Sequence, residues 1–255
     1  MQIVRFYFNE RVRYGRVENE RITHVRKELG SGNWTPVSEK IELTSVRVMA
    51  PVEPGKVIAL GYNYKDLVGE QNHYNEPIMF LKPPSSVVGP GEAIRIIEHK
   101  KTWVEVELAI VIGRKAKNVG PVEAAACILG YTVANDVTMQ NVHERDHHLA
   151  RSKGIDTFCP LGPWIETELD PRDLALTTTI NGAPFQNSRT SRQILGSTEI
   201  VSYISKFMTL NAEDVILTGT PANAESSVIQ TGDRVSCFVE GIGTLENTVE
   251  WVISE

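Results

Sequence analysis

Two glutamates lie two positions apart in the stretch KTWVEVELAIVIG, residues 101–113. The stretch is rich in β-branched and apolar residues, a composition typical of a strand. Because strand side chains alternate, Glu105 and Glu107 point to the same face. Like charges on one face repel unless water or a cation lies between them. The pair therefore indicates either a solvated edge strand or a site for a hard cation, since Mg²⁺, Mn²⁺ and Ca²⁺ prefer oxygen ligands.

The surrounding sequence favours the cation site. Residues 108–112 are continuously apolar, which is typical of a strand covered on both faces. Asp136, at the end of the strand-like run GYTVANDVT, can supply a third carboxylate, although a simple strand-end turn is an alternative interpretation. Lys153 precedes a glycine in a polar loop. It is either a solvated surface charge or, beside a metal, a partner for an anionic substrate.

A second candidate metal motif is the run HERDH at residues 143–147, which spells H-E-x-x-H. On a helix this spacing places two histidines one turn apart, where they bind zinc. Here the intervening pair, Arg145 and Asp146, is charged, which indicates a hydrated surface, and no third ligand follows at a suitable spacing. We therefore do not expect a zinc protease.

The elements that position these residues are predicted to be mostly short strands. Near the amino terminus, the runs IVRFYF, RVRYGRVE and ERITHVR predict three paired strands, and a polar, turn-rich segment follows them. The run PVEPGK, at residues 51–56, has the composition of a boundary. We therefore predict a small β domain over residues 1–51 and a main domain over residues 52–255.

The main domain repeats short strand-like runs between Gly and Pro turns. Helical periodicity is confined to residues 122–130 and 198–208. Many strands and few helices predict an α+β fold that is mostly β, without alternating βαβ units. The predicted strands lie at residues 57–61, 78–82, 107–113, 176–182, 214–219 and 234–243.

Composition and charge exclude several classes of partner. The chain is 41% hydrophobic and 23% charged, and its net charge of −6 includes no basic block, so neither nucleic acid nor an anionic membrane is expected. No apolar run is long enough to span a bilayer, and the amino terminus lacks the apolar core of a signal peptide. Three widely spaced cysteines predict neither a disulfide framework nor a zinc cluster. We expect a cytoplasmic protein.

Eight motifs, in this order, give the chain a resemblance to the fumarylacetoacetate hydrolase family over about residues 51–255. The small amino-terminal β module also looks like one that these proteins often carry. The resemblance implies a mixed β-roll fold and a homodimer. The motifs are VIALGYNYKD (57–66), FLKPPSSVVGPGE (80–92), EVELAIVIG (105–113), GYTVANDVT (130–138), SKGIDTFCPLGPW (152–164), INGAPFQ (180–186), FMTLNAEDVILTGTP (207–221) and GDRVSCFVEGIGTLEN (232–247).

The resemblance also implies a set of site residues. It assigns a divalent cation, Mg²⁺ or Mn²⁺, to two strand glutamates and an aspartate, which match Glu105, Glu107 and Asp136. Lys153 matches the family's active-site lysine. Gln186 and Thr220 match positions that contact the substrate, and Lys82 is expected near the same pocket.

The substrates that the resemblance implies are 2-oxo acids or their enols. Their carboxylate and 2-oxygen chelate the cation, which stabilises the negative charge of an enolate. An enolate can lead to hydrolysis of a C–C bond, to decarboxylation, or to keto–enol and double-bond isomerisation. Which of these follows depends on the residues that move protons and on whether water attacks.

Two departures from the hydrolase pattern bear on that choice. The run NYKDLVGE keeps Glu70 but has Leu67 where hydrolases carry the histidine of a water-activating His–Glu pair, and Gln140 stands at an arginine position. Both favour an isomerase or decarboxylase of aromatic catabolism, acting on a 2-hydroxy-dienoate or a 2-oxo diacid, with Glu70 as acid or base. The alternatives are an acylpyruvase-type C–C hydrolase, with His73 replacing the histidine, and a protein that binds a 2-oxo acid without turnover.

Overall fold

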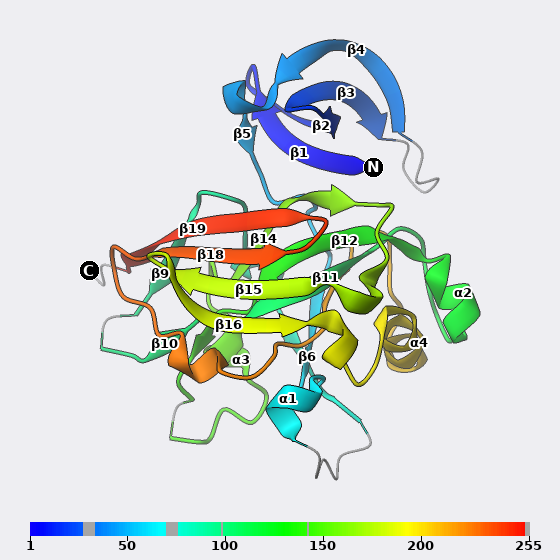
Figure 1. Cartoon of the computed structure of the whole chain (residues 1–255). Helices are drawn as coiled ribbons and strands as arrows, with labels where there is room; N and C mark the ends of the chain where they lie inside the picture. The colour runs from blue at the N-terminus through cyan, green and yellow to red at the C-terminus, as the bar shows by residue number, and fades with distance from the viewer. Residues whose placement is uncertain (28–33, 70–75, 98, 142, 253–255) are drawn as a thin grey trace.

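The computed structural model describes residues 1–27, 34–69, 76–97, 99–141 and 143–252 (Figure 1). As the sequence predicts, the chain has an α+β fold that is mostly β. A 12-stranded sheet and a 5-stranded sheet pack against each other, and a two-stranded ribbon lies beside them. The two sheets enclose the main apolar core, so polar side chains that serve a site must lie at the ends of strands.

The large sheet contains the strands that carry the predicted metal ligands. Its central strand β11 (Val106–Ile112) is buried along its whole length and pairs antiparallel with both β12 and β17. The predicted strands at 57–61 and 78–82 are β6 and β7, with the expected bounds. The remaining members are β12 (Ile128–Asn135), β14 (Cys159–Glu166), β17 (Val215–Leu217), β6 (Val57–Gly61), β7 (Ile78–Lys82), β8 (Val87–Val88), β5 (Arg47–Val48) and the amino-terminal strands β1 (Gln2–Phe8), β2 (Arg11–Glu18), β3 (Arg21–Lys27) and β4 (Trp34–Glu42).

The smaller sheet covers one face of the large one. Its strands run in the order β16, β15, β18, β19 and β9, and β15 contacts β11 directly. Its bounds are β16 (Ala183–Arg189), β15 (Ala175–Ile180), β18 (Arg234–Val239), β19 (Gly243–Trp251) and β9 (Ala93–Ile96), and the ribbon pairs β10 (Thr102–Trp103) with β13 (Thr138–Met139).

Helices are few and short among the described residues. The helix predicted over 198–208 is α4, whose first turn is closed by the Glu199 carboxylate accepting from the Gly196 N–H at 2.8 Å. It spans Ser197–Phe207, and the other three described α-helices are α1 (Lys65–Val68), α2 (Pro121–Ala125) and α3 (Ala150–Lys153). There are also 3₁₀ turns at Leu43–Ser45, Pro84–Ser86, Pro171–Asp173, Thr190–Arg192 and Ala224–Ser226.

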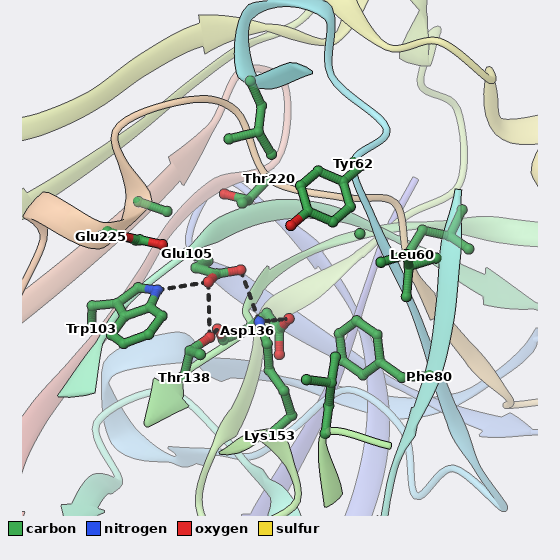
Figure 2. A pocket seen from close by; sticks show the side chains of 15 residues that line it. Leu60, Tyr62, Phe80, Trp103, Glu105, Asp136, Thr138, Lys153, Thr220 and Glu225 are labelled. Carbon is green, nitrogen blue, oxygen red and sulfur yellow. Dashed lines mark hydrogen bonds and ion pairs between the residues drawn. The ribbon is translucent and has the colours of Figure 1, made fainter. Parts of the chain in front are cut away.

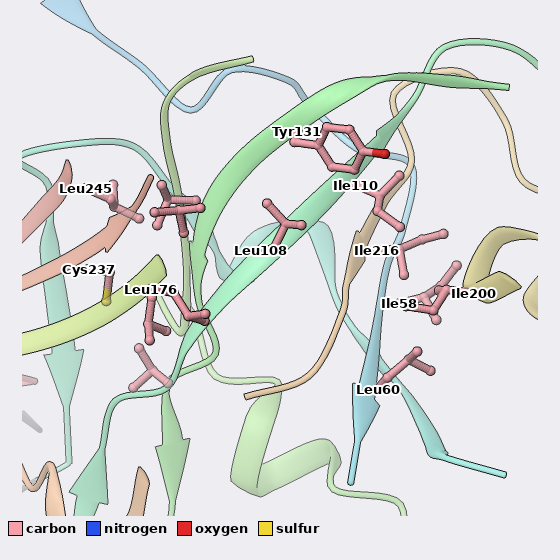
Figure 3. Packing of buried hydrophobic residues seen from close by; sticks show 14 of the residues in the cluster. Ile58, Leu60, Leu108, Ile110, Tyr131, Leu176, Ile200, Ile216, Cys237 and Leu245 are labelled. Atoms are coloured by element: carbon pink, nitrogen blue, oxygen red, sulfur yellow. The ribbon is translucent and has the colours of Figure 1, made fainter. Parts of the chain in front are cut away.

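The core fills the space between the two sheets and α4 (Figure 3). Leu108 and Ile110 of β11 pack there with Ile58 of β6 and Ile200 of α4, all of them fully buried. Moving a strand out of a densely packed core would open cavities, and each cavity costs free energy. The strands that carry the site are therefore held in place by this core.

The amino-terminal strands form a meander that joins the large sheet through β1. Register pairs Gln2 of β1 with both Val17 of β2 and Glu166 of β14. The module also has its own small core, which includes Phe6 and Ile22. The three predicted strands are present as β1, β2 and β3, while the domain boundary near residue 51 stays a prediction.

Three segments differ from the sequence prediction. The strand predicted over residues 234–243 ends at Val239, and a turn at residues 240–242 leads into β19. The polar stretch predicted as turns contains β4, which is held by pairing along β3. The helical run predicted over residues 122–130 is divided, because α2 ends at Ala125 and β12 begins at Ile128, opposite Ile112. In the polar stretch and in the helical run, pairing with another strand overrides the local pattern, as tertiary contacts often do for short elements.

Candidate active site

The three predicted metal ligands lie together at the edge of the central strands. Glu107 is in β11, Glu105 immediately precedes that strand, and Asp136 follows β12. The Asp136 N–H donates to the Glu105 carbonyl at 2.9 Å, which fixes the two chain segments side by side. One carboxylate oxygen from each residue lies within 4.8 Å of the others. The exposed fraction is 8% for Glu105 and 1% for both Glu107 and Asp136. The alternative of a solvated edge strand is therefore wrong.

Two lysines share the Asp136 carboxylate. Lys153, at the end of α3, donates from Nζ to Asp136 Oδ2 at 2.5 Å and to Glu105 Oε2 at 2.9 Å (Figure 2). Lys82, the last residue of β7, donates to Asp136 Oδ1 at 2.5 Å. The predicted active-site lysine is therefore buried among the carboxylates and is not a solvated surface charge.

Burial and charge shift the pKa values of this cluster in different directions. Burial raises the pKa of Glu107 well above its usual range, and the negative charges of Asp136 and Glu105 raise it further. Burial opposes ionisation of Asp136, but Lys153 and Lys82 outweigh it and lower that pKa. Glu107 accepts from the Gly219 N–H at 2.5 Å and, among the described residues, forms no ion pair with a lysine. Converging buried carboxylates with excess negative charge fit a hard divalent cation.

Two side chains that sequence reasoning missed hold Glu105 in place. Its Oε1 accepts from the indole Nε1 of Trp103 and from Oγ1 of Thr138, each at 2.8 Å. These residues face each other across the β10–β13 ribbon. Each lies two positions from a predicted ligand, Trp103 before Glu105 and Thr138 after Asp136. A spacing of two residues from each predicted ligand was therefore the signal that could have found them.

A cavity of about 210 Å³ opens beside the carboxylates (Figure 2). Glu105, Asp136, Lys153 and Thr220 form its polar side. Leu67, at the position of the missing histidine, also lines it. The rest of the wall is mainly apolar and includes Leu60, Tyr62, Ile78, Phe80 and Leu149. A small acid fits this space with its polar end against the cluster.

The predicted substrate contacts lie at different depths. Thr220 lines the cavity, donates to the Val106 carbonyl at 3.1 Å and accepts from Gln186 Nε2 at 3.0 Å. Gln186 is fully buried, and its Oε1 accepts from the Val106 N–H and from Thr178 Oγ1. Lys82 is buried on the far side of Asp136 and is not among the residues lining the cavity. The predicted contacts of these residues with a substrate stay predictions.

Two further predictions concern Glu70 with His73, and the H-E-x-x-H run at residues 143–147. Glu70 and His73 lie outside the described residues. The described residues 143–149 contain turns and no helix, so the spacing that H-E-x-x-H needs is not formed there. Asp146 of that run instead accepts from the N–H groups of Arg151 and Ser152, at the start of α3. It thereby helps to position the helix that ends in Lys153.

Comparison with known proteins gives two family matches. Residues 56–250 match the family described as fumarylacetoacetate (FAA) hydrolase C-terminal, and residues 1–51 match the one described as Rv2993c-like, N-terminal. The chain is 46% identical over 213 residues to protein Rv2993c of Mycobacterium tuberculosis, covering 81% of this chain and 80% of that one. It is 38% identical to the oxaloacetate tautomerase fahd2, mitochondrial, of Xenopus laevis, covering 81% of this chain and 69% of that one.

Solved structures resemble the chain over nearly its whole length. The 5-carboxymethyl-2-hydroxymuconate delta-isomerase from Mycobacterium smegmatis is 39% identical, with a TM-score of 0.92 over 99% of this chain and 100% of that one. A maleylpyruvate hydrolase from Sphingobium sp. SYK-6, in complex with manganese (II) ion and pyruvate, is 25% identical, with a TM-score of 0.81 over 98% of this chain and 99% of that one.

None of the described helices is long and apolar enough to cross a membrane. The chain belongs to the fumarylacetoacetate hydrolase family.

Proposed function

We propose that this protein is a divalent-metal-dependent isomerase or decarboxylase that acts through an enolate on a 2-hydroxy-dienoate or a 2-oxo diacid, as in aromatic catabolism. The observation that carries the proposal is the buried cluster of Glu105, Glu107 and Asp136 at the polar end of a small cavity. The isomerase and tautomerase relatives support it. The wider class, a family of isomerases and hydrolases, is shown by the comparisons.

The residues of the cluster divide the work. Glu105, Glu107 and Asp136 would hold Mg²⁺ or Mn²⁺, and a bound dication would supply Lewis-acid stabilisation of negative charge on the substrate's 2-oxygen. Lys153 borders the cavity with a charged ammonium group, since Asp136 and Glu105 outweigh burial and raise its pKa. It would bind the anionic end of the substrate or hold a proton there. The apolar part of the wall would reduce the contact of a bound substrate with water.

Leu67 supports isomerisation or decarboxylation over hydrolysis. Its side chain lines the cavity, and a leucine cannot take a proton from water. Glu70 as acid or base belongs to the proposal. The alternative, a C–C hydrolase of the acylpyruvase type, is favoured by the maleylpyruvate hydrolase relative. In that alternative, His73 would replace the lost histidine in activating the water.

The proposal is tested by an ultraviolet assay, with Mg²⁺ and again with EDTA, on oxaloacetate, an acylpyruvate and 2-hydroxyhepta-2,4-dienedioate. We expect EDTA-sensitive loss of the enol or diene band, with mass spectrometry showing an isomerised or decarboxylated product. Lys153→Met should lose this activity, whereas Lys56→Met, at a half-buried Lys–Asp pair outside the cavity, should keep it. Release of pyruvate and a carboxylic acid would favour the hydrolase. Binding without any product would support the non-catalytic alternative.

Two further parts of the proposal come from the sequence alone. We infer a homodimer from the family resemblance and a cytoplasmic location from composition and charge. Light scattering coupled to gel filtration tests the dimer, since the chain mass is 28.4 kDa and a dimer has about twice that mass. A monomer at micromolar concentration would contradict this part and leave the proposed chemistry unaffected.

A further inference from the structure

Lys82 is a lysine that contacts a predicted metal ligand without reaching the cavity. Its side chain is 0% exposed, and Nζ donates to Asp136 Oδ1 at 2.5 Å and to the Val137 carbonyl at 3.4 Å. Lys153 holds the other oxygen of Asp136 and does line the cavity. The two lysines therefore occupy opposite sides of one carboxylate, and only Lys153 is on the substrate side.

Fold stability alone does not account for this arrangement. A buried ion pair is often no more stable than two well-packed apolar residues of the same volume, because both charges lose their hydration. Lys82 ends β7, and the two residues before it, Phe80 and Leu81, are apolar. An apolar side chain at position 82 is therefore compatible with the local sequence. The charge itself is the feature that needs a role.

The net charge of the carboxylate–lysine cluster gives the Lys82 charge a role. When ionised, the three carboxylates and two ammonium groups carry a net charge of about −1, and a bound dication brings the total to about +1. Without Lys82, the loaded site would be neutral and would give a 2-oxo acid anion no net attraction. We propose that Lys82 is a positioning residue that sets this net charge, weakening the hold of Asp136 on the cation and strengthening the site's hold on an anionic substrate.

The direction in which removal of Lys82 changes the metal affinity distinguishes this role from a structural role and from a direct substrate contact. An outer-shell partner that makes a ligand more basic strengthens metal binding, whereas an ammonium group competes with the cation for the same carboxylate. Removing Lys82 should therefore tighten metal binding and weaken anion binding. A merely structural lysine would loosen metal binding when removed, and a substrate contact would leave it unchanged.

The test is calorimetric titration of Lys82→Met, which keeps the length of the side chain and removes its charge. We expect the Kd for Mn²⁺ to fall about tenfold, a size typical of coupling between partly screened buried charges. At saturating Mn²⁺, the Kd for oxalate should rise about tenfold, and that for pyruvate, with half the charge, about threefold. Lys82→Gln is a second neutral variant and should show the same signs. Lys56→Met is the matched control, since Lys56 pairs with Asp214 before β17, and should change neither affinity.

Each other outcome overturns the inference. Weaker or unchanged Mn²⁺ binding in both neutral variants would assign Lys82 a structural role or a substrate contact. Equal losses for oxalate and pyruvate would also indicate a direct contact. Failure of both variants to fold with Mn²⁺ present would make the residue structural. The inference rests on the proposed metal site. A wild-type chain that binds no Mn²⁺ would refute the proposed function. Normal Mn²⁺ binding by the wild type, with unaltered affinities in the Lys82 variants, would refute this inference alone.

Discussion

Replacing Glu107 with glutamine tests the metal assignment at a ligand that is only 1% exposed. The amide keeps an oxygen that can accept the Gly219 N–H, so the local fold is preserved while one ligand charge is lost. Two ionised carboxylate oxygens at 4.8 Å, the upper limit of the separations in this cluster, repel by about 3.5 kcal/mol at an effective dielectric constant of about 20. Glu107 faces two such neighbours in the metal-free protein. We therefore expect Glu107→Gln to be at least as stable as wild type in EDTA.

The same change should remove the stabilisation that a bound cation gives. At a Mn²⁺ concentration 100 times the wild-type Kd, binding stabilises the fold by about 2.7 kcal/mol. If the variant binds about 100-fold more weakly, its gain is only about 0.4 kcal/mol. In a chain of this size, each kcal/mol shifts Tm by about 2–4 °C, so Mn²⁺ should raise the wild-type Tm by about 5–11 °C and the variant's by about 1–2 °C.

Differential scanning calorimetry in EDTA and in Mn²⁺ measures both effects. Asp214→Asn is the control, because Asp214 is equally buried and charged but pairs with Lys56, away from the cavity. The control should lose stability in both buffers and keep the full Mn²⁺ shift. A Glu107→Gln protein that kept the wild-type shift would refute the assignment of Glu107 as a ligand.

Three further predictions follow from the contacts around the site. Trp103→Phe keeps the ring but removes the indole N–H that binds the first glutamate, so Mn²⁺ affinity measured by calorimetry should fall about tenfold; unchanged affinity would argue against a positioning role. The double variant His143→Ala/His147→Ala should keep wild-type metal content by mass spectrometry, and loss of metal would revive the zinc motif. Burial raises the pKa of Cys159 and Cys237 to about 12, so the folded protein should resist a thiol reagent at pH 8 that labels the denatured chain, and fast labelling of the folded state would contradict this burial. Because these folded values exceed the usual 9.0, the thiols' contribution to stability is present below pH 9 and is lost as the pH rises toward 12.

The three carboxylate ligands could be predicted from the sequence because their positions depend on local chain geometry. Glu105 and Glu107 lie two positions apart at the start of one strand, and Asp136 directly follows the next strand along the chain, which pairs with the first. The strands at residues 57–61 and 78–82 were equally predictable, since each is a short apolar run between turn residues. The family resemblance added the lysine, whose place in the cluster no local pattern encodes.

What the sequence did not reveal depends on contacts between distant segments. That Lys82 and Lys153 bind opposite oxygens of one carboxylate follows from the packing of β7 and α3 around Asp136. Gln186 looks like a substrate contact in the motif, yet it lies fully buried behind Thr220, and this depth is set by three separate chain segments. Local periodicity also carried no sign of β4, whose polar sequence is held in place by its pairing with β3.

The central claim is that the carboxylate cluster holds a cation and supports enolate formation on a 2-oxo acid. Its most direct test is hydrogen–deuterium exchange at C3 of oxaloacetate, followed by NMR in D₂O with Mg²⁺. We predict that the protein accelerates exchange above the uncatalysed rate and that EDTA and Glu107→Gln both abolish the acceleration. Exchange at the uncatalysed rate with Mg²⁺ bound, or acceleration that survives EDTA, would contradict the account.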